Sequence, residues 1–192
     1  MGHDAVMGEK AALRKAIRAQ RAEQGSPNID PSMMSLLPAH AVVAGYLARG
    51  DEPSIDALLG QIIAQGSTVL LPRVDDDQLR WVGVTDLVQV QVGAYGIREP
   101  IAGVDADIAT VNVVLIPALA VDHRGIRLGQ GGGYYDRALA GIPRWVDDGP
   151  CRIAVINDAE FIDEVPAEPH DVIVDAVMTP STLHWLTRRA SQ

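Results

Sequence analysis

The run from Arg127 to Arg137, Arg-Leu-Gly-Gln-Gly-Gly-Gly-Tyr-Tyr-Asp-Arg, combines residue types that suit the binding of a nucleotide and a metal ion. Four of the five positions from 129 to 133 are glycine, so the backbone can approach a ligand that side chains would otherwise block. The backbone N–H groups of such a loop can bind phosphate oxygens. The arginines add cations for phosphate, and Asp136 adds a carboxylate of the kind that magnesium prefers. The run therefore indicates a nucleotide-using site.

The glycine spacing separates this run from the familiar phosphate-binding motifs. It has no Gly-Lys-Ser/Thr ending, and its Gly-x-Gly-x-Gly spacing differs from the Gly-x-Gly-x-x-Gly of dinucleotide-binding folds. A glycine run alone also occurs in simple tight turns. The flanking arginine, tyrosines and aspartate favour a functional interpretation over that alternative.

A second group of basic residues lies near the N-terminus. Lys10, Arg14, Arg18 and Arg21 recur at intervals of four, four and three, beside Leu13 and Ile17. This spacing predicts an amphipathic helix that starts near Glu9 and ends at residues 25–28. Lys10 and Arg14 lie one turn apart, so both could reach one polyphosphate; the alternative is a solvated basic stripe.

The elements that must position these residues follow an alternating pattern. Apolar strands are predicted at 41–47, 68–71, 79–84, 111–116, 152–156 and 172–174, with Pro72 ending the second, and helices at 55–65 and 181–189. Because the apolar strands are continuous, we expect one three-layer α/β domain over 9–192, with a mostly parallel or mixed central sheet and helices on both faces. Residues 1–8 are expected to form a flexible leader. Ligands of such sheets bind beyond the carboxyl ends of strands, where residues 117–136 would lie.

Composition narrows the class of protein. The chain has 192 residues, 47% of them hydrophobic and 21% charged, which is ordinary for one globular domain. Its formal net charge of −9 argues against nucleic-acid binding, which needs a basic face. Cys151 is the only cysteine, and no apolar run is long enough to span a bilayer. We expect a cytoplasmic monomer that binds neither nucleic acid nor a membrane.

The region 113–139 carries a resemblance to a known family. Its segments Ile-Pro-Ala-Leu-Ala-Val-Asp, Gly-x-Arg-Leu-Gly and Gly-x-Gly-Tyr-Tyr-Asp-Arg resemble the signature of the 5-formyltetrahydrofolate cyclo-ligase family. The pieces Lys10-x-x-x-Arg14, Tyr46-Leu47, Asp51-Glu52 and His170-Asp171 also resemble it, so that the resemblance extends over most of the chain. Glu160 stands where that family usually has glutamine, and Leu79-Arg80-Trp81 also departs from its pattern. We expect these departures to affect pterin contacts more than the ATP site.

The resemblance implies an ATP- and Mg²⁺-dependent enzyme that converts 5-formyltetrahydrofolate to 5,10-methenyltetrahydrofolate, releasing ADP and phosphate. It implies catalytic roles for Arg127 and Lys10, and metal ligands at Asp136 and Asp171. The ATP-binding residues would be Lys10, Arg14, Arg127, Leu128, Gly129, Gln130, Gly131, Gly132, Gly133, Tyr134 and Tyr135. The substrate-binding residues would be Leu47, Glu52, Gln130, Gly131, Gly132, Gly133 and Tyr134.

Each of these roles has a structural alternative. Arg127 could form a surface salt bridge with Asp122 or Asp136, and the tyrosines could pack into the core. Glu52 could be a solvated acid before the helix at 55–65. Two other functions also stay open: a folate- or nucleotide-binding module without turnover, and another α/β enzyme such as a sugar-phosphate isomerase or coenzyme A transferase.

Overall fold

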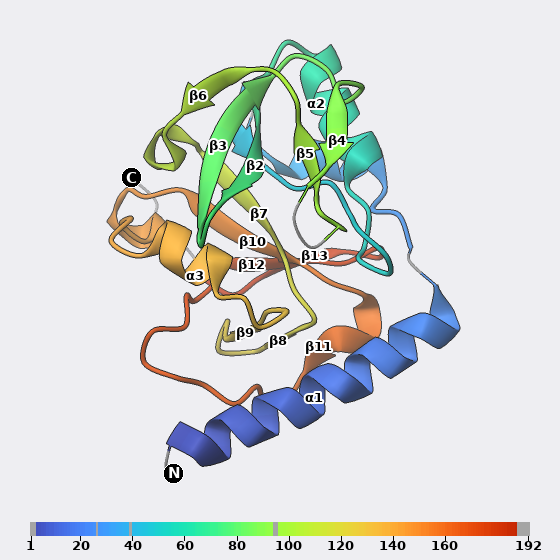
Figure 1. Cartoon of the computed structure of the whole chain (residues 1–192), viewed down its shortest axis with the longest axis vertical. Coiled ribbons are helices and arrows are strands. Elements are labelled where there is room, and N and C mark those ends of the chain that lie inside the picture. Colours follow the sequence, from blue (N-terminus) through green and yellow to red (C-terminus); the bar gives the residue numbers. More distant parts are fainter. Residues whose placement is uncertain (1–2, 26, 39, 94–95, 188–192) are drawn as a thin grey trace.

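A computed structural model describes residues 3–25, 27–38, 40–93 and 96–187 (Figure 1). Its α-helices are α1 (His3–Gln24), α2 (Asp56–Ala64) and α3 (Tyr134–Leu139), with 3₁₀ helices η1 (Pro31–Leu36), η3 (Ile108–Thr110), η4 (Trp145–Asp147) and η5 (Asp158–Glu160). The strands are β1 (Val43–Ala44), β2 (Val69–Asp75), β3 (Gln78–Val84), β4 (Val90–Val92), β5 (Arg98–Pro100), β6 (Val104–Ala106), β7 (Val113–Pro117), β8 (Ala120–Asp122), β9 (Arg127–Leu128), β10 (Cys151–Val155), β11 (Phe161–Ile162), β12 (Ala176–Met178) and β13 (Leu183–Trp185).

The main sheet has eight strands in the order β13-β12-β10-β7-β1-β2-β3-β6. The five strands from β12 to β2 are parallel, and β13, β3 and β6 join them in antiparallel pairs. Two small sheets, β11-β8-β9 and β4-β5, lie apart from it. The expected mixed sheet is confirmed, with its parallel strands at the centre and antiparallel strands at both edges.

Both faces of the main sheet are buried, which explains why its strands read as continuous apolar runs. Val113, Leu115 and Ile153 point to one core, which α2 covers with Leu58, Leu59 and Ile62. The alternate residues Val114, Ile116 and Ala154 point to a second core on the opposite face, which Leu139 of α3 joins. The three-layer arrangement follows from this alternation, since successive side chains of a strand face opposite ways.

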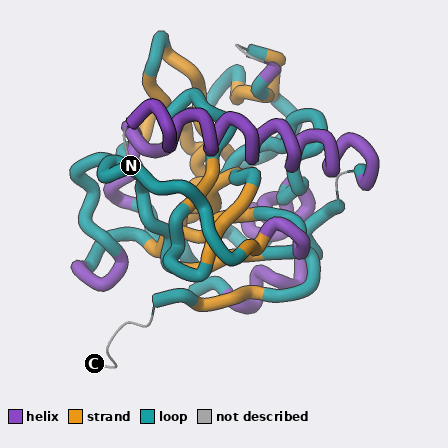
Figure 2. Tube along the Cα trace, turned by 90° about the horizontal axis from the view of Figure 1, so that it is seen from below, coloured by secondary structure: helices purple, strands orange, loops and turns teal. Residues whose placement is uncertain are grey.

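Helix α1 lies across one end of the molecule, beside β8, β9 and β11 (Figure 1), and Figure 2 shows the same helix from below as the long purple coil. Its apolar edge, Leu13 and Ile17, packs on a small cluster of Leu119, Ala120, Leu128 and Val165. Leu119, Ala120 and Leu128 lie between β7 and the glycine loop, and Val165 follows β11. The helix is thereby docked beside the loop that the sequence indicated as a binding site.

The N-terminal leader expected at residues 1–8 differs from the structure, in which α1 begins at His3. Two features favour the longer helix: Asp4 lies in the first turn, where a negative charge is favourable, and His3 Nδ1 lies 2.8 Å from Glu168 Oε1. The division into one domain over 9–192 stays a prediction.

Three other expectations were wrong. The strand expected at 172–174 is only an isolated bridge between Ile173 and Ile126, and β12 begins two residues later, at Ala176. Strand β2 continues through Pro72 to Asp75, because β1 pairs with β2 only at Val69 and Leu70 and proline is tolerated where one side is unpaired. The helix expected at 181–189 is, in its described part, the antiparallel strand β13. A turn in which Thr179 N–H donates to the Thr182 carbonyl folds β13 back onto β12, and the indole of Trp185 stacks on Trp145. Residues 188–189 lie outside the described residues.

None of the helices in the described part of the chain has both the length and the apolar content needed to cross a bilayer.

Candidate active site

A cavity of about 670 Å³ lies between α1, the glycine loop and the segment 168–171. Every residue that the sequence suggested for ATP, folate or metal lines it: Lys10, Arg14, Leu47, Glu52, Arg127, Leu128, Gly129, Gln130, Gly131, Gly132, Gly133, Tyr134, Tyr135, Asp136 and Asp171. Four segments far apart in sequence are therefore brought to one place. The assignments themselves, residue by residue, stay proposals.

The basic edge of α1 makes contacts with the rest of the protein, although Arg18 is itself exposed. The Lys10 ammonium lies 2.9 Å from Glu168 Oε2 and 2.7 Å from Asp171 Oδ2, and Arg14 Nε donates to the Gly129 carbonyl at 2.9 Å. Farther along, Arg18 donates to the side chain and carbonyl of Gln130. The alternative of a solvated stripe does not hold for Lys10, which is 4% exposed. Lys10 and Arg14 both line the cavity, as their helical spacing predicted.

The glycine loop connects β9 to α3 through backbone conformations that favour glycine. Gly131 has φ +108° and Gly133, which caps α3, has φ +66°. A Cβ at Gly131 would lie 3.6 Å from the Arg14 guanidinium, so this glycine is required by its backbone conformation more than by space. The loop thus presents main chain to the cavity beneath the side chains of α1.

Arg127 and Asp136 flank the loop and pair with each other, with Arg127 Nη2 2.8 Å from Asp136 Oδ1. Burial disfavours the Asp136 carboxylate, but the Arg127 guanidinium and a hydrogen bond from Val172 N–H together act against burial, and the pKa of Asp136 is lowered. Of the two salt-bridge partners considered for Arg127, Asp122 is excluded, because its carboxylate accepts from Arg124 and from Val165 N–H. Asp136 is the partner, and both residues still line the cavity.

Three buried polar atoms of cavity-lining residues have no hydrogen-bond partner among the described residues: Arg127 Nε, the Tyr135 hydroxyl and Glu168 Oε1, which lies at ion-pair distance from His3. Burial raises the pKa of Tyr135, which keeps this hydroxyl protonated and able to donate. The Tyr135 ring packs edge-on against Trp81 at a centroid distance of 6.0 Å. The Tyr135 ring therefore packs in the core, which was the structural alternative for this residue. Its hydroxyl has no partner and could form a hydrogen bond with a polar ligand.

On another wall, Glu52 lies 7% exposed beside the buried Leu47. Burial raises the pKa of Glu52, although a hydrogen bond from Arg49 N–H and the charge of Arg49 act against this rise. The Gln130 side chain also hydrogen-bonds to Glu52. The solvated-acid alternative is therefore wrong, and Gln130 connects the glycine loop to this carboxylate.

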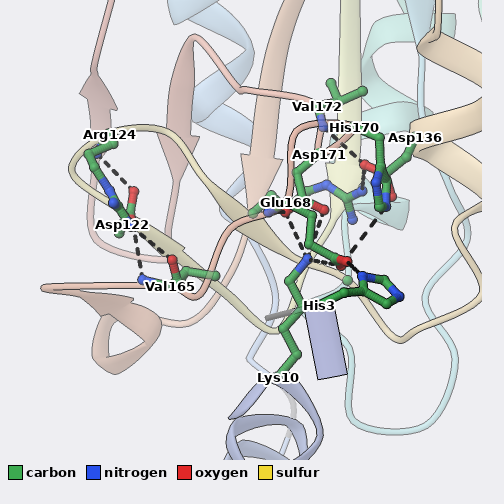
Figure 3. Close-up of polar contacts among 12 residues, drawn as sticks. His3, Lys10, Asp122, Arg124, Asp136, Val165, Glu168, His170, Asp171 and Val172 are labelled. Atoms are coloured by element: carbon green, nitrogen blue, oxygen red, sulfur yellow. Dashed lines mark hydrogen bonds and ion pairs between the residues drawn. The ribbon is translucent and has the colours of Figure 1, made fainter. Parts of the chain in front are cut away.

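The candidate metal ligands fit an oxygen-preferring cation, since Asp136 and Asp171 both present carboxylates to the same cavity. Glu168 and His170 stand beside Asp171, with ligand atoms of the three within 4.8 Å of one another (Figure 3). The Lys10 ammonium lowers the pKa of Glu168 through its hydrogen bond. Sequence analysis missed Glu168; its spacing of three residues from Asp171 was the available signal.

Glu160, the departure noted from the family pattern, lies away from the cavity. Its carboxylate is 3% exposed and pairs with the buried Arg21. It also accepts from Asn157 N–H in the cap of η5. An effect of Glu160 on pterin contacts, expected from sequence, has no direct contact to support it, because neither Glu160 nor Arg21 lines the cavity.

Further cavity residues were not assigned from the sequence: Met7, Tyr46, Arg49, Pro72, Asp76, Asp77, Leu79, Ile97, Pro117, Arg137, Glu168 and His170. Five of the twelve come from the β2–β3 hairpin and from α3, which are joined by hydrogen bonds from Arg137 to the Asp77 carbonyl. No local pattern marks them, since their position depends on how the hairpin is placed over the loop.

The fold and this cavity define an α/β protein whose one composite site combines cations, carboxylates and a glycine-rich backbone loop. A model of the 5-formyltetrahydrofolate cyclo-ligase family matches residues 6–180. The chain belongs to the 5-formyltetrahydrofolate cyclo-ligase family. Membership in this family of enzymes implies a folate and ATP as substrates.

Individual relatives agree with the family match. The chain is 35% identical to a 5-formyltetrahydrofolate cyclo-ligase of Mycolicibacterium smegmatis, over 92% of this chain and 90% of the relative. It is 27% identical to the enzyme of the same name from Escherichia coli, over 88% and 94%. The solved structure of a 5,10-methenyltetrahydrofolate synthetase from Aquifex aeolicus superposes with a TM-score of 0.75 at 24% identity, covering 95% of each chain. That likeness supports the fold.

Proposed function

We propose that this chain catalyses the ATP- and Mg²⁺-dependent cyclisation of 5-formyltetrahydrofolate to 5,10-methenyltetrahydrofolate, with release of ADP and phosphate. One observation carries the proposal beyond family membership: the residues suggested for ATP, folate and metal line a single cavity. A reaction that transfers a phosphoryl group from a nucleotide to a folate needs both in contact, and a shared cavity supports this arrangement.

The chemistry explains why these groups are needed. A formamide is a poor electrophile, and its oxygen leaves poorly as hydroxide. Transfer of the ATP γ-phosphoryl group to the formyl oxygen forms a C–O–P bond as the bond to ADP breaks. N10 of the same folate then attacks the activated carbon and loses its proton, the ring closes, and phosphate leaves as its C–O bond breaks. The second step is intramolecular, so its effective molarity is high once the phosphoryl group is in place.

On the nucleotide side, Lys10, Arg14 and Arg127 supply positive charge to phosphoryl oxygens, and the backbone of Gly129–Gly133 supplies N–H groups. The unpaired Nε of Arg127 supports a ligand at this position. Asp136 and Asp171 would hold Mg²⁺, which would neutralise the charge of the transferring group. The burial of Lys10 and Arg127 strengthens their interaction with phosphate, because screening by water is reduced.

On the folate side, Glu52 would accept hydrogen bonds from pterin N–H groups, with Leu47 as an apolar wall. Gln130 donates to Glu52 from the glycine loop and is itself bound by Arg18 of α1. The folate and nucleotide walls are therefore joined by one side chain. This connection would keep the formyl group next to the loop that binds the phosphates.

The test is a near-ultraviolet absorbance time course with purified protein, 5-formyltetrahydrofolate, ATP and Mg²⁺. We expect a methenyltetrahydrofolate band only when all four are present. Arg127→Ala should lower turnover by about 100-fold or more, whereas Arg80→Ala, at an exposed arginine outside the cavity, should not. Binding of ATP without turnover would favour a binding module, and no binding of either ligand would favour another α/β enzyme. The cytoplasmic location and the monomeric state stay predictions.

A further inference from the structure

The Lys10 ammonium is held by two carboxylates at once. Its Nζ lies 2.9 Å from Glu168 Oε2, and 2.9 and 2.7 Å from the two oxygens of Asp171 (Figure 3). All three side chains are less than a tenth exposed. Arg127 differs, since Asp136 is its one ion-pair partner among the described residues. Lys10 therefore has one more carboxylate partner than Arg127 has.

If the proposed function holds, Asp171 would bind the metal ion and also pair with the Lys10 ammonium, and these two interactions compete. As a metal ligand it would bring a doubly charged cation next to the ammonium that both of its oxygens now contact. Like charges at such a distance repel, and the repulsion is strong where water is largely excluded. When Asp171 turns to a metal ion, Lys10 therefore loses this partner, and its long side chain would gain freedom to leave the cavity.

Glu168 has contacts of its own that would keep it beside Lys10 when the Asp171 carboxylate binds the metal ion. Glu168 and Asp171 belong to one turn, in which Asp171 N–H donates to the Glu168 carbonyl at 3.1 Å and Glu168 N–H donates to Asp171 Oδ2 at 2.7 Å. The other Glu168 oxygen, Oε1, faces His3 at 2.8 Å. One Glu168 oxygen therefore faces Lys10 and the other faces His3, so Glu168 keeps a contact with the ammonium that does not involve the Asp171 carboxylate.

We propose that Glu168 is a positioning residue that keeps the Lys10 ammonium directed at the nucleotide phosphates while Asp171 serves the metal ion. Glu168 acts only through Lys10 and touches neither the folate nor the reacting atoms. This inference rests on the proposed function, and it assigns a role to a residue for which the sequence suggested none.

A double-mutant cycle on nucleotide affinity tests it. Binding of ATP with Mg²⁺ is measured by calorimetry, without folate, for wild type, Glu168→Ala, Lys10→Met and the double variant. We expect Glu168→Ala to weaken binding about tenfold, the usual cost of losing one charged hydrogen-bond partner. In the Lys10→Met background the same change should have no further effect, because there is no ammonium left to position.

Two variants separate positioning from general structure. Glu168→Gln keeps an oxygen that can accept from Lys10 and should bind within about threefold of wild type. Glu164→Ala, an exposed acid in the same segment, is the matched control and should bind as wild type. Folding of each variant is checked by denaturant unfolding.

Equal weakening by Glu168→Ala in both backgrounds would overturn the positioning role and leave the proposed function intact. So would unchanged binding by Glu168→Ala when Lys10→Met weakens it. Unchanged binding by Lys10→Met would overturn the positioning role together with the assignment of Lys10 to ATP. Turnover of the wild-type preparation is recorded in parallel, and its absence would count against the proposed function itself.

Discussion

Arg21 and Glu160 form a two-point ion pair inside the protein, with Nε 2.6 Å from Oε1 and Nη2 2.7 Å from Oε2. The pair joins α1 to η5, and Arg21 Nη2 also donates to the Ala118 carbonyl after β7. Its members are 1% and 3% exposed, so each depends on the other for neutralisation. The pair fixes α1 at its C-terminal half, as Lys10 does nearer the N-terminus.

We predict that Glu160→Ala lowers the free energy of unfolding by about 3–5 kcal/mol, because it leaves the Arg21 guanidinium buried without its counter-charge. Glu160→Gln, which introduces the residue usual in the family, keeps one acceptor and should cost less. Urea denaturation measures both. Glu164→Gln, at a side chain 77% exposed, is the control and should change stability by less than about 0.5 kcal/mol. Similar losses for all three would show that the buried pair has no special role.

We predict that Asp136→Asn raises the Mg²⁺ concentration needed for half-maximal turnover by about tenfold or more, since an amide is a weaker ligand than a carboxylate. The measurement is a magnesium titration at saturating ATP and folate. Asp163→Asn, at an exposed acid outside the cavity, is the matched control. An unchanged magnesium requirement in Asp136→Asn would remove Asp136 from the metal site.

We predict that the folate KM rises at low pH because Glu52 becomes protonated. Burial raises the pKa of Glu52, so as pH falls this carboxylate is protonated sooner than an ordinary glutamate, and it then accepts fewer hydrogen bonds from the pterin. Asp136, with its lowered pKa, stays ionised over the same range. The folate KM should therefore rise toward low pH in wild type, and Glu52→Gln should show a high KM with no such rise. A rise that persists in Glu52→Gln would assign it to another group.

We predict opposite effects for two glycine-to-alanine substitutions. Gly131→Ala forces a residue with a Cβ to φ +108°, which costs about 1–3 kcal/mol and should loosen the loop, with a higher ATP KM. Gly60→Ala lies in α2, where a Cβ would meet nothing within 4 Å, and should stabilise by about 0.5–1 kcal/mol with unchanged kinetics. Thermal unfolding and ATP kinetics measure both. A Gly131→Ala enzyme with wild-type ATP KM would show that the loop does not require this conformation.

Much of this arrangement could be predicted from local pattern. The spacing of Leu13, Ile17 and the basic residues marked α1, and the apolar run at 113–117 marked a strand leading to the glycine loop. These signals are local, because the hydrophobic periodicity of a helix face or a buried strand can be recognised within a few consecutive residues.

What could not be predicted depends on contacts between distant segments. The edge strand β13 contains only Leu183–Trp185, and its form is set by β12 and by the stacking of Trp185 on Trp145. The two carboxylate partners of Lys10 lie 158 and 161 residues away in the sequence, so the residues near Lys10 cannot predict them. The basic edge of α1 was visible in the sequence, but which acid each cation would meet was not.

The position of α1 has a consequence for how the protein is made. During synthesis this helix leaves the ribosome before any of its partners, and it must wait for the glycine loop, then residue 160, and finally residues 168–171. An isolated amphipathic helix is marginal in water. Helix α1 therefore reaches its native place late, because Lys10 meets its carboxylate partners only after residues 168–171 have emerged.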